Sequence, residues 1–184
     1  NHRIVGQLFG GPSACGEIPS NMNDYYGKFA TSWNTGTTSS TRLRDWLDPN
    51  NCGVTVLNGF DPNNPPVSLD ANLFSITSPV STSSCASSIT PSIVLRNLGG
   101  TTLTSVTINW KLDSNPVNVF SWTGSITTNC FANVTLPVIS VSPGIHTYSV
   151  FTSLPNGSAD MNLTSGSVGV SLTIISPTPL GSLP

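Results

Sequence analysis

The fold of most of this 184-residue chain is indicated by the run Ser92-Ile-Val-Leu-Arg-Asn-Leu-Gly-Gly-Thr-Thr-Leu-Thr-Ser-Val-Thr-Ile-Asn-Trp110. Within it, Val106, Ile108 and Trp110 alternate with polar residues, which predicts a strand with one buried face. The shorter apolar segment Ile93–Arg96 predicts a second strand, and the two adjacent glycines between the segments are a turn signal. This part of the chain is therefore predicted to be all-β.

The same pattern continues on both sides of this run. Turn signals rich in Pro, Gly and Asn separate five further predicted strands: Leu73–Ile76, Val117–Trp122, Phe131–Leu136, Ile145–Phe151 and Val168–Ile174. About seven strands at this spacing are typical of a sandwich of two sheets. We therefore predict an immunoglobulin-like β-sandwich over residues 71–175, followed by a tail or linker over residues 176–184.

The chain changes character at residues 61–70, which carry three prolines and no periodicity and are predicted to form a linker. Before this linker, we expect a strand at Arg3–Phe9, a helix at Ser39–Leu47 and a strand at Val54–Leu57. So few elements cannot bury a core of their own. Residues 1–60 are therefore interpreted as part of a larger fold.

Charge is scarce and unevenly distributed. The chain has 6 Lys+Arg and 8 Asp+Glu, and 10 of these 14 side chains lie in residues 1–70. The net charge of −2 argues against a nucleic-acid partner, which would require a basic face. No run of about 18 apolar residues exists, so we expect no membrane span. The chain opens Asn-His-Arg, so we expect no signal peptide within it and interpret it as a processed or internal piece.

The four cysteines, Cys15, Cys52, Cys85 and Cys130, are widely separated. They form no C-x-x-C pair and have no histidine at ligand spacing, so we expect no metal site and no cofactor. Disulfides formed in an oxidising compartment fit this pattern better. We therefore expect a secreted or cell-surface protein.

Catalytic chemistry is hard to place in this chain. A Ser–His–Asp triad needs a base beside its nucleophile, but no serine stands in a G-x-S-x-G setting. His2 lies at the start of the chain, and His146 is expected on the surface of a strand. Asp45 and Asp48 flank the end of the predicted helix, where they are expected to be solvated or to cap it. The chain alone is therefore expected to be inactive.

Asp24 is the carboxylate of most interest because it lies in the aromatic-bordered loop Asn23-Asp-Tyr-Tyr-Gly27. One interpretation is a turn residue, a position that Asn and Asp favour. The other is a specificity carboxylate at the base of a pocket, where a low dielectric makes one ion pair discriminating. The residues alone leave both interpretations open.

Residues 2–60 resemble the end of a lysyl endopeptidase, a secreted bacterial serine protease with a trypsin-like double β-barrel. The resemblance is carried by four segments in the same order: Arg3-Ile-Val-Gly-Gln-Leu-Phe-Gly-Gly-Pro-Ser-Ala-Cys15, Asn23-Asp-Tyr-Tyr-Gly-Lys-Phe29, Ser32-Trp33 and Thr41-Arg-Leu-Arg-Asp-Trp-Leu-Asp-Pro49. In that family, this part follows directly after the nucleophilic serine. The resemblance therefore implies that the whole triad lies upstream of Asn1.

The same resemblance implies roles for individual residues. Leu8, Phe9 and Gly10 match the strand edge that pairs with the substrate backbone, and Asp24 matches the carboxylate that selects lysine. Cys15 matches a cysteine whose disulfide partner lies in the missing upstream segment. A Cys15–Cys52 bond remains an open alternative, because Cys52 has no counterpart in the family.

Residues 71–175 resemble the CARDB-type, immunoglobulin-like modules that are appended to secreted bacterial proteins. The resemblance is carried by the Ser92–Trp110 run, by Trp122-Thr-Gly-Ser125 and by Leu136-Pro137. Cys85 and Cys130 both fall inside this module, so we expect them to form a disulfide with each other. The two resemblances together predict the C-terminal part of a trypsin-like double β-barrel followed by a sandwich.

Two functions follow as hypotheses. The chain is either a portion of a secreted, lysine-directed serine endopeptidase with an accessory sandwich, or a structural or adhesive surface protein that uses a protease-like scaffold without catalysis. The first needs an upstream protease segment and a peptide or protein substrate. The second rests on weakly charged strands rich in Ser, Thr and Asn, whose edges can pair with those of another copy.

Overall fold

The structure is a computed structural model that describes residues 6–11, 25–54, 63, 67–81, 83–162 and 166–176, with the backbone alone at residues 6–10 and 26. The chain divides into two compact units, Asn1–Val54 and Thr55–Pro184. Across the described residues, no helix is long and apolar enough to cross a membrane.

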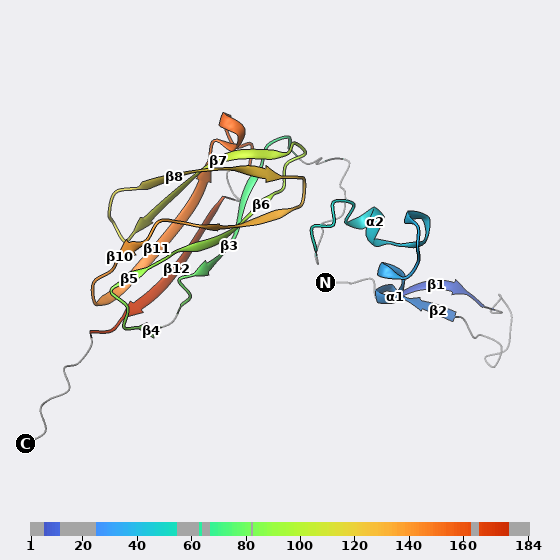
Figure 1. Ribbon diagram of the computed structural model, residues 1–184, viewed down its shortest axis with the longest axis horizontal. Helices are drawn as coiled ribbons and strands as arrows, with labels where there is room; N and C mark the ends of the chain where they lie inside the picture. The colour runs from blue at the N-terminus through green and yellow to red at the C-terminus, as the bar shows by residue number, and fades with distance from the viewer. Residues whose placement is uncertain are drawn as a thin grey trace, which may run out of the picture. The chain divides into compact units, whose positions relative to one another are not determined.

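Unit 1 begins with two short strands (Figure 1). Strand β1 (Gly6–Gly10) pairs antiparallel with β2 (Tyr25–Lys28), and helix α1 (Phe29–Asn34) follows directly. The 3₁₀ turn η2 (Ser39–Thr41) and the short helix α2 (Arg44–Leu47) complete the unit. Helix α2 ends before Asp48-Pro49 because a residue that precedes proline is disfavoured in helical geometry.

The helical part of unit 1 differs from the sequence-based expectation. The predicted helix Ser39–Leu47 is instead η2 and α2, separated by the extended backbone of Arg42. Helix α1 was not predicted, although the Phe29 and Trp33 rings, one turn apart, contact each other with centroids 5.9 Å apart. The predicted strand Val54–Leu57 lies largely outside the described residues, and Val54 itself is in neither helix nor strand.

Unit 1 buries none of its described apolar side chains. Among its described side chains only Asp48 is buried, where it accepts hydrogen bonds from the backbone N–H groups of Cys52 and Gly53. Trp46 is 71% exposed and Tyr25 65%. The described part of unit 1 thus has no hydrophobic core.

Unit 2 contains a five-stranded sheet with the strand order β4-β12-β11-β7-β8. All neighbours in it are antiparallel except β12 and β4, which are parallel. Its strands are β4 (Ser83–Ser84), β7 (Leu103–Leu112), β8 (Asn118–Ile126), β11 (Gly144–Ser153) and β12 (Ser167–Ile174). The turn η3 (Pro155–Gly157) follows β11.

The second sheet has three antiparallel strands in the order β3-β6-β9, with bounds β3 (Ala71–Ser78), β6 (Ser92–Asn97) and β9 (Phe131–Thr135). A separate two-stranded pair joins β5 (Ser88–Ile89) to β10 (Ile139–Ser140). All seven predicted strands are present, and the three short ones, β4, β5 and β10, were not predicted. The all-β fold is confirmed for this part of the chain, whereas the trypsin-like barrel stays a prediction.

The core lies between the two sheets of unit 2 (Figure 1). Alternate residues of each long strand supply it, so that Leu95 of β6, Ile108 of β7 and Tyr148 of β11 are all fully buried. Trp110 belongs to the core, and its ring centroid lies 6.1 Å from that of Tyr148. The apolar residues whose alternation predicted the strands are therefore the residues that form the core.

The cysteine pairing differs from the expectation. Cys52 and Cys130 are disulfide-bonded, whereas Cys85 is an exposed free thiol. The predicted Cys85–Cys130 bond is therefore wrong, and sharing a module did not make these two residues partners. Cys15 lies outside the described residues.

Candidate functional site

The strand edge assigned to substrate binding is strand β1. Leu8 lies opposite Tyr26 and Gly10 lies opposite Tyr25, and the register shifts between them, so that Phe9 is an extra residue on β1. Within the described residues, β1 pairs with β2 alone. Asp24 lies outside the described residues and immediately precedes β2. The roles of these four residues therefore stay predictions.

A histidine–aspartate pair, not predicted from the sequence, lies at one end of the five-stranded sheet. Strands β7 and β11 are neighbours, so the residue after β7, Asp113, lies beside His146 and Thr147 of β11. His146 Nδ1 is 2.7 Å from Asp113 Oδ2, and the Thr147 N–H donates to Asp113 Oδ1 at 2.7 Å. His146 is 9% exposed rather than on the strand surface as expected.

This pair has the histidine–aspartate contact of a catalytic triad but no nucleophile at the other ring nitrogen. The carboxylate orients the imidazole through Nδ1, as in a serine protease. However, His146 Nε2 lies 2.8 Å from the backbone carbonyl oxygen of Ser142, so the nitrogen that would accept a proton from a nucleophile faces an acceptor instead. The arrangement clamps the β7–β8 turn to β11 and does not activate a nucleophile.

Both ring nitrogens of His146 face acceptors, and only the imidazolium form can donate to both. The hydrogen bond to Asp113, followed by that to the Ser142 carbonyl, raises the pKa of His146 above its usual value, although burial opposes this shift. The same hydrogen bond, with that from Thr147, lowers the pKa of Asp113.

The clamp predicts a pH-dependent stability. Because the pKa of His146 is raised on folding, its contribution is complete below the unfolded-state pKa of about 6.5 and is lost as the pH rises through the folded-state value. The contribution of Asp113, whose pKa is lowered, is lost only in acid, as the pH falls through its folded-state value. We therefore expect the Tm difference between the wild type and His146→Gln to be largest near pH 5 and to shrink toward pH 9. The variant His2→Gln is the control. A Tm difference that is constant from pH 5 to pH 9 would contradict the clamp.

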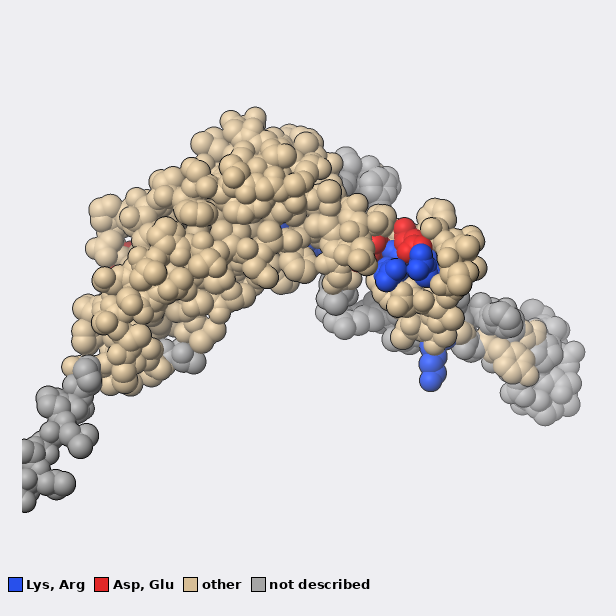
Figure 2. All heavy atoms as spheres, in the orientation of Figure 1, with Lys and Arg blue, Asp and Glu red and all other residues tan. Residues whose placement is uncertain are grey.

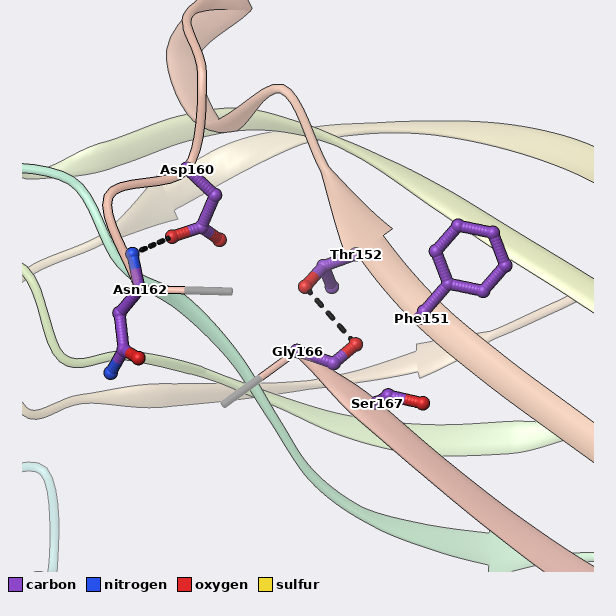
Figure 3. Close-up of a pocket in the computed structure, with 6 residues that line it drawn as sticks. All are labelled: Phe151, Thr152, Asp160, Asn162, Gly166 and Ser167. Carbon is purple, nitrogen blue, oxygen red and sulfur yellow. Dashed lines mark hydrogen bonds between the residues drawn. The ribbon is translucent and has the colours of Figure 1, made fainter. Parts of the chain in front are cut away.

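A cavity of about 260 Å³ opens at the other end of β11 (Figure 3). It is lined by the end of β11, the start of β12 and the connection between them, through Phe151, Thr152, Asp160, Asn162, Gly166 and Ser167. Figure 3 shows Asp160 and Asn162 on one side of Thr152 and the Phe151 ring on the other. The cavity is large enough to hold several water molecules or a small polar group.

Two carboxylates lie near this cavity, and Asn162 contacts both. Its backbone N–H donates to Asp160 Oδ1 at 3.0 Å, and its side-chain amide donates to Asp70 Oδ2 at 2.9 Å. Burial raises the pKa of Asp160, and the charge of Asp70 adds to that shift, against the hydrogen bonds from Asn162 and Ala71. The arrangement ties the connection after β11 to the segment that enters β3.

The sequence-predicted site residues and these two structural sites do not coincide. The alternation along β11 could have predicted that His146 is buried. His146 shares one face of the strand with Tyr148, Val150 and Thr152, and all four are buried. That pattern predicts that His146 points inward, but it does not predict that Asp113 and Asp160 lie beside β11. Such neighbours require knowledge of the strand order.

No protein-family model matches the chain. Among solved structures, it is similar to the CARDB domain of a Pyrococcus furiosus protein, crystallised in complex with di-metal ions, with 13% identity and a TM-score of 0.49 over 62% of this chain and 100% of that one. It is also similar to a solution structure of the same domain, with 14% identity and a TM-score of 0.45 over 60% of this chain and 96% of that one. A β-glucosidase from Listeria innocua follows, with 13% identity and a TM-score of 0.35 over 71% of this chain and 21% of that one.

Proposed function

We propose that this chain is the C-terminal portion of a secreted bacterial lysine-directed serine endopeptidase that carries an accessory β-sandwich. Peptide-bond hydrolysis would use a Ser–His–Asp triad on polypeptide upstream of Asn1. Unit 1 would supply the substrate-binding side of the protease domain, and unit 2 would be the accessory module. The chain by itself would be inactive.

The observation that carries this proposal is the lack of a hydrophobic core in the described part of unit 1. A domain is stable when its apolar side chains leave water, but Tyr25 and Trp46 are mostly exposed and no apolar side chain described there is buried. More polypeptide packed on these residues would provide the missing interior. The resemblance to lysyl endopeptidases suggests that this polypeptide is the upstream part of a trypsin-like barrel.

The proposed chemistry assigns one role to β1 and another to Asp24. An extended peptide would pair with the backbone of Leu8, Phe9 and Gly10, as a strand adds to an open sheet edge. The Asp24 carboxylate would bind the ammonium group of the substrate lysine, since a desolvated carboxylate strongly favours a cationic partner. The disulfide state of Cys52 and Cys130 supports an oxidising, extracellular location.

The proposal predicts the effect of Asp24→Asn in the full-length protein. We expect kcat/KM for lysyl peptides to fall about a hundredfold, because the neutral amide cannot balance the ammonium charge. The control is Asp61→Asn, in the proline-rich linker, which should leave kcat/KM unchanged. Activity is measured on matched lysyl and arginyl peptide substrates. A lysine preference that survives Asp24→Asn would refute the assigned role.

A second measurement tests the proposal as a whole. Intact mass and N-terminal sequencing of the native protein should reveal an upstream polypeptide that contains a nucleophilic serine. A native protein without such a segment, or without hydrolysis of any lysyl substrate, would refute the endopeptidase function.

A further inference from the structure

The five-stranded sheet ends in two very different edges. At one edge, β4 has two residues, whereas at the other β8 has nine. Figure 1 shows β8 beside β7 on the outside of the sandwich, and no other described strand pairs with it. A long open edge presents unpaired backbone donors and acceptors to another strand.

Two usual protections of an edge, proline and charge, are missing from β8. It contains no proline and no charged residue, and Asp113 and Asp160 are the nearest Asp, Glu, Lys or Arg on either side in the sequence. On the face of the sandwich turned toward the viewer in Figure 2, charged side chains are almost absent. The outward-facing residues of β8 are Val119, which is 64% exposed, Ser121 and Thr123.

The inner face of β8 is only partly covered. Phe120 and Trp122 pack against the core but remain partly exposed. The Trp122 indole lies close over Gly124, since a Cβ at that position would come within 2.5 Å of the ring. The Trp122 side chain therefore covers the backbone of β8 at Gly124.

We infer that β8 pairs antiparallel with β8 of a second copy of this chain. A two-fold axis requires antiparallel pairing of identical strands. The irregularity in the β7–β8 pairing between Thr123 and Ile126 limits the regular segment to Asn118–Thr123. Opposite residues must share a face, so the axis passes at Phe120, which sets Val119 opposite Ser121, or at Ser121, which sets Val119 opposite Thr123.

The lack of charge on β8 favours a second copy as its partner. A basic or acidic peptide would find no complementary charge on β8, whereas β8 itself brings a neutral strand with matching alternation. Pairing would also lay Phe120 and Trp122 of one copy beside those of the other and so bury more apolar surface. The contact would join two sheets into one continuous sheet. It does not depend on proteolytic activity.

The test compares two lysine substitutions in the full chain. Ser121→Lys places two ammonium groups near the two-fold axis, so the dimer dissociation constant measured by analytical ultracentrifugation should rise at least about tenfold. Ser171→Lys is the control because Ser171 is also an exposed serine of the five-stranded sheet, on β12 rather than on β8, and it should leave the constant unchanged.

Hydrogen exchange gives a readout at the strand itself. Amides of β8 should exchange more slowly as the wild-type protein concentration rises, and this protection should be lost in Ser121→Lys. A wild type that is monomeric at all concentrations, or equal effects of the two substitutions, would overturn the inference. Protection of β8 that requires an added extended peptide would also overturn it and would identify a peptide as the occupant.

Discussion

Replacing Asn97 by alanine is expected to lower the free energy of unfolding of the sandwich by about 3–5 kcal/mol. Asn97 is the last residue of β6 and is 1% exposed. Its amide nitrogen donates to the carbonyl oxygens of Thr101 and Ile126, each at 2.8 Å, and its Oδ1 accepts from the Gly99 N–H at 3.0 Å. Alanine would leave these three backbone groups without that partner at a largely buried site, where each unsatisfied group is costly.

The same side chain connects the two sheets, because β6 belongs to the three-stranded sheet and Ile126 ends β8 of the five-stranded sheet. Asn133→Ala is the matched control, since Asn133 lies on the neighbouring strand β9 with an exposed side chain. Urea unfolding followed by intrinsic fluorescence measures both variants. A loss below about 1 kcal/mol for Asn97→Ala would contradict this role.

The strands of the sandwich were predictable because the pattern that identifies each strand lies within that strand's own sequence. A strand with one buried face must alternate, and the alternation around Val106, Ile108 and Trp110 locates β7 without knowledge of its neighbours. The helical segments of unit 1 were less predictable because α1 and α2 are short and no residue in either is buried. Propensity without packing is a weak signal for so few residues.

The features of the sites that could not be predicted are pairings across the sheets. Nothing in the sequence separation of Asp113 and His146 indicates their contact, which follows from β7 and β11 being neighbours. Cysteine pairing also depends on which strands and loops are neighbours. Four cysteines can pair in three ways, and their spacing in the sequence does not distinguish between these ways. Asn97 did give a local signal, because it occupies the inward phase of β6 after Ile93 and Leu95.

The turn after Asn97 carries the second large effect, at Gly99. The backbone of this turn runs against the segment that enters β3: the Leu98 N–H donates to the Asp70 carbonyl, and the Gly100 N–H donates to the Val67 carbonyl. A Cβ on Gly99 would lie 2.6 Å from the Ser68 carbonyl oxygen and 2.8 Å from the Asp70 nitrogen. Both atoms belong to the backbone, so neither can move aside as a flexible side chain would. The two segments would have to separate and lose hydrogen bonds.

We therefore expect Gly99→Ala to lower the free energy of unfolding by about 3 kcal/mol. The adjacent Gly100→Ala is the control, because a Cβ there meets nothing closer than the Val67 carbonyl oxygen at 3.9 Å. Both variants lower the entropy of the unfolded chain by the same amount. The difference between their free energies of unfolding therefore measures the effect of the close approach between the turn and the segment that enters β3. Gly99→Ala should also be less than additive with Asn97→Ala, since the Asn97 side chain binds the Gly99 N–H. Equal Tm values for the two glycine variants would show that the turn and the entry segment are not tightly packed.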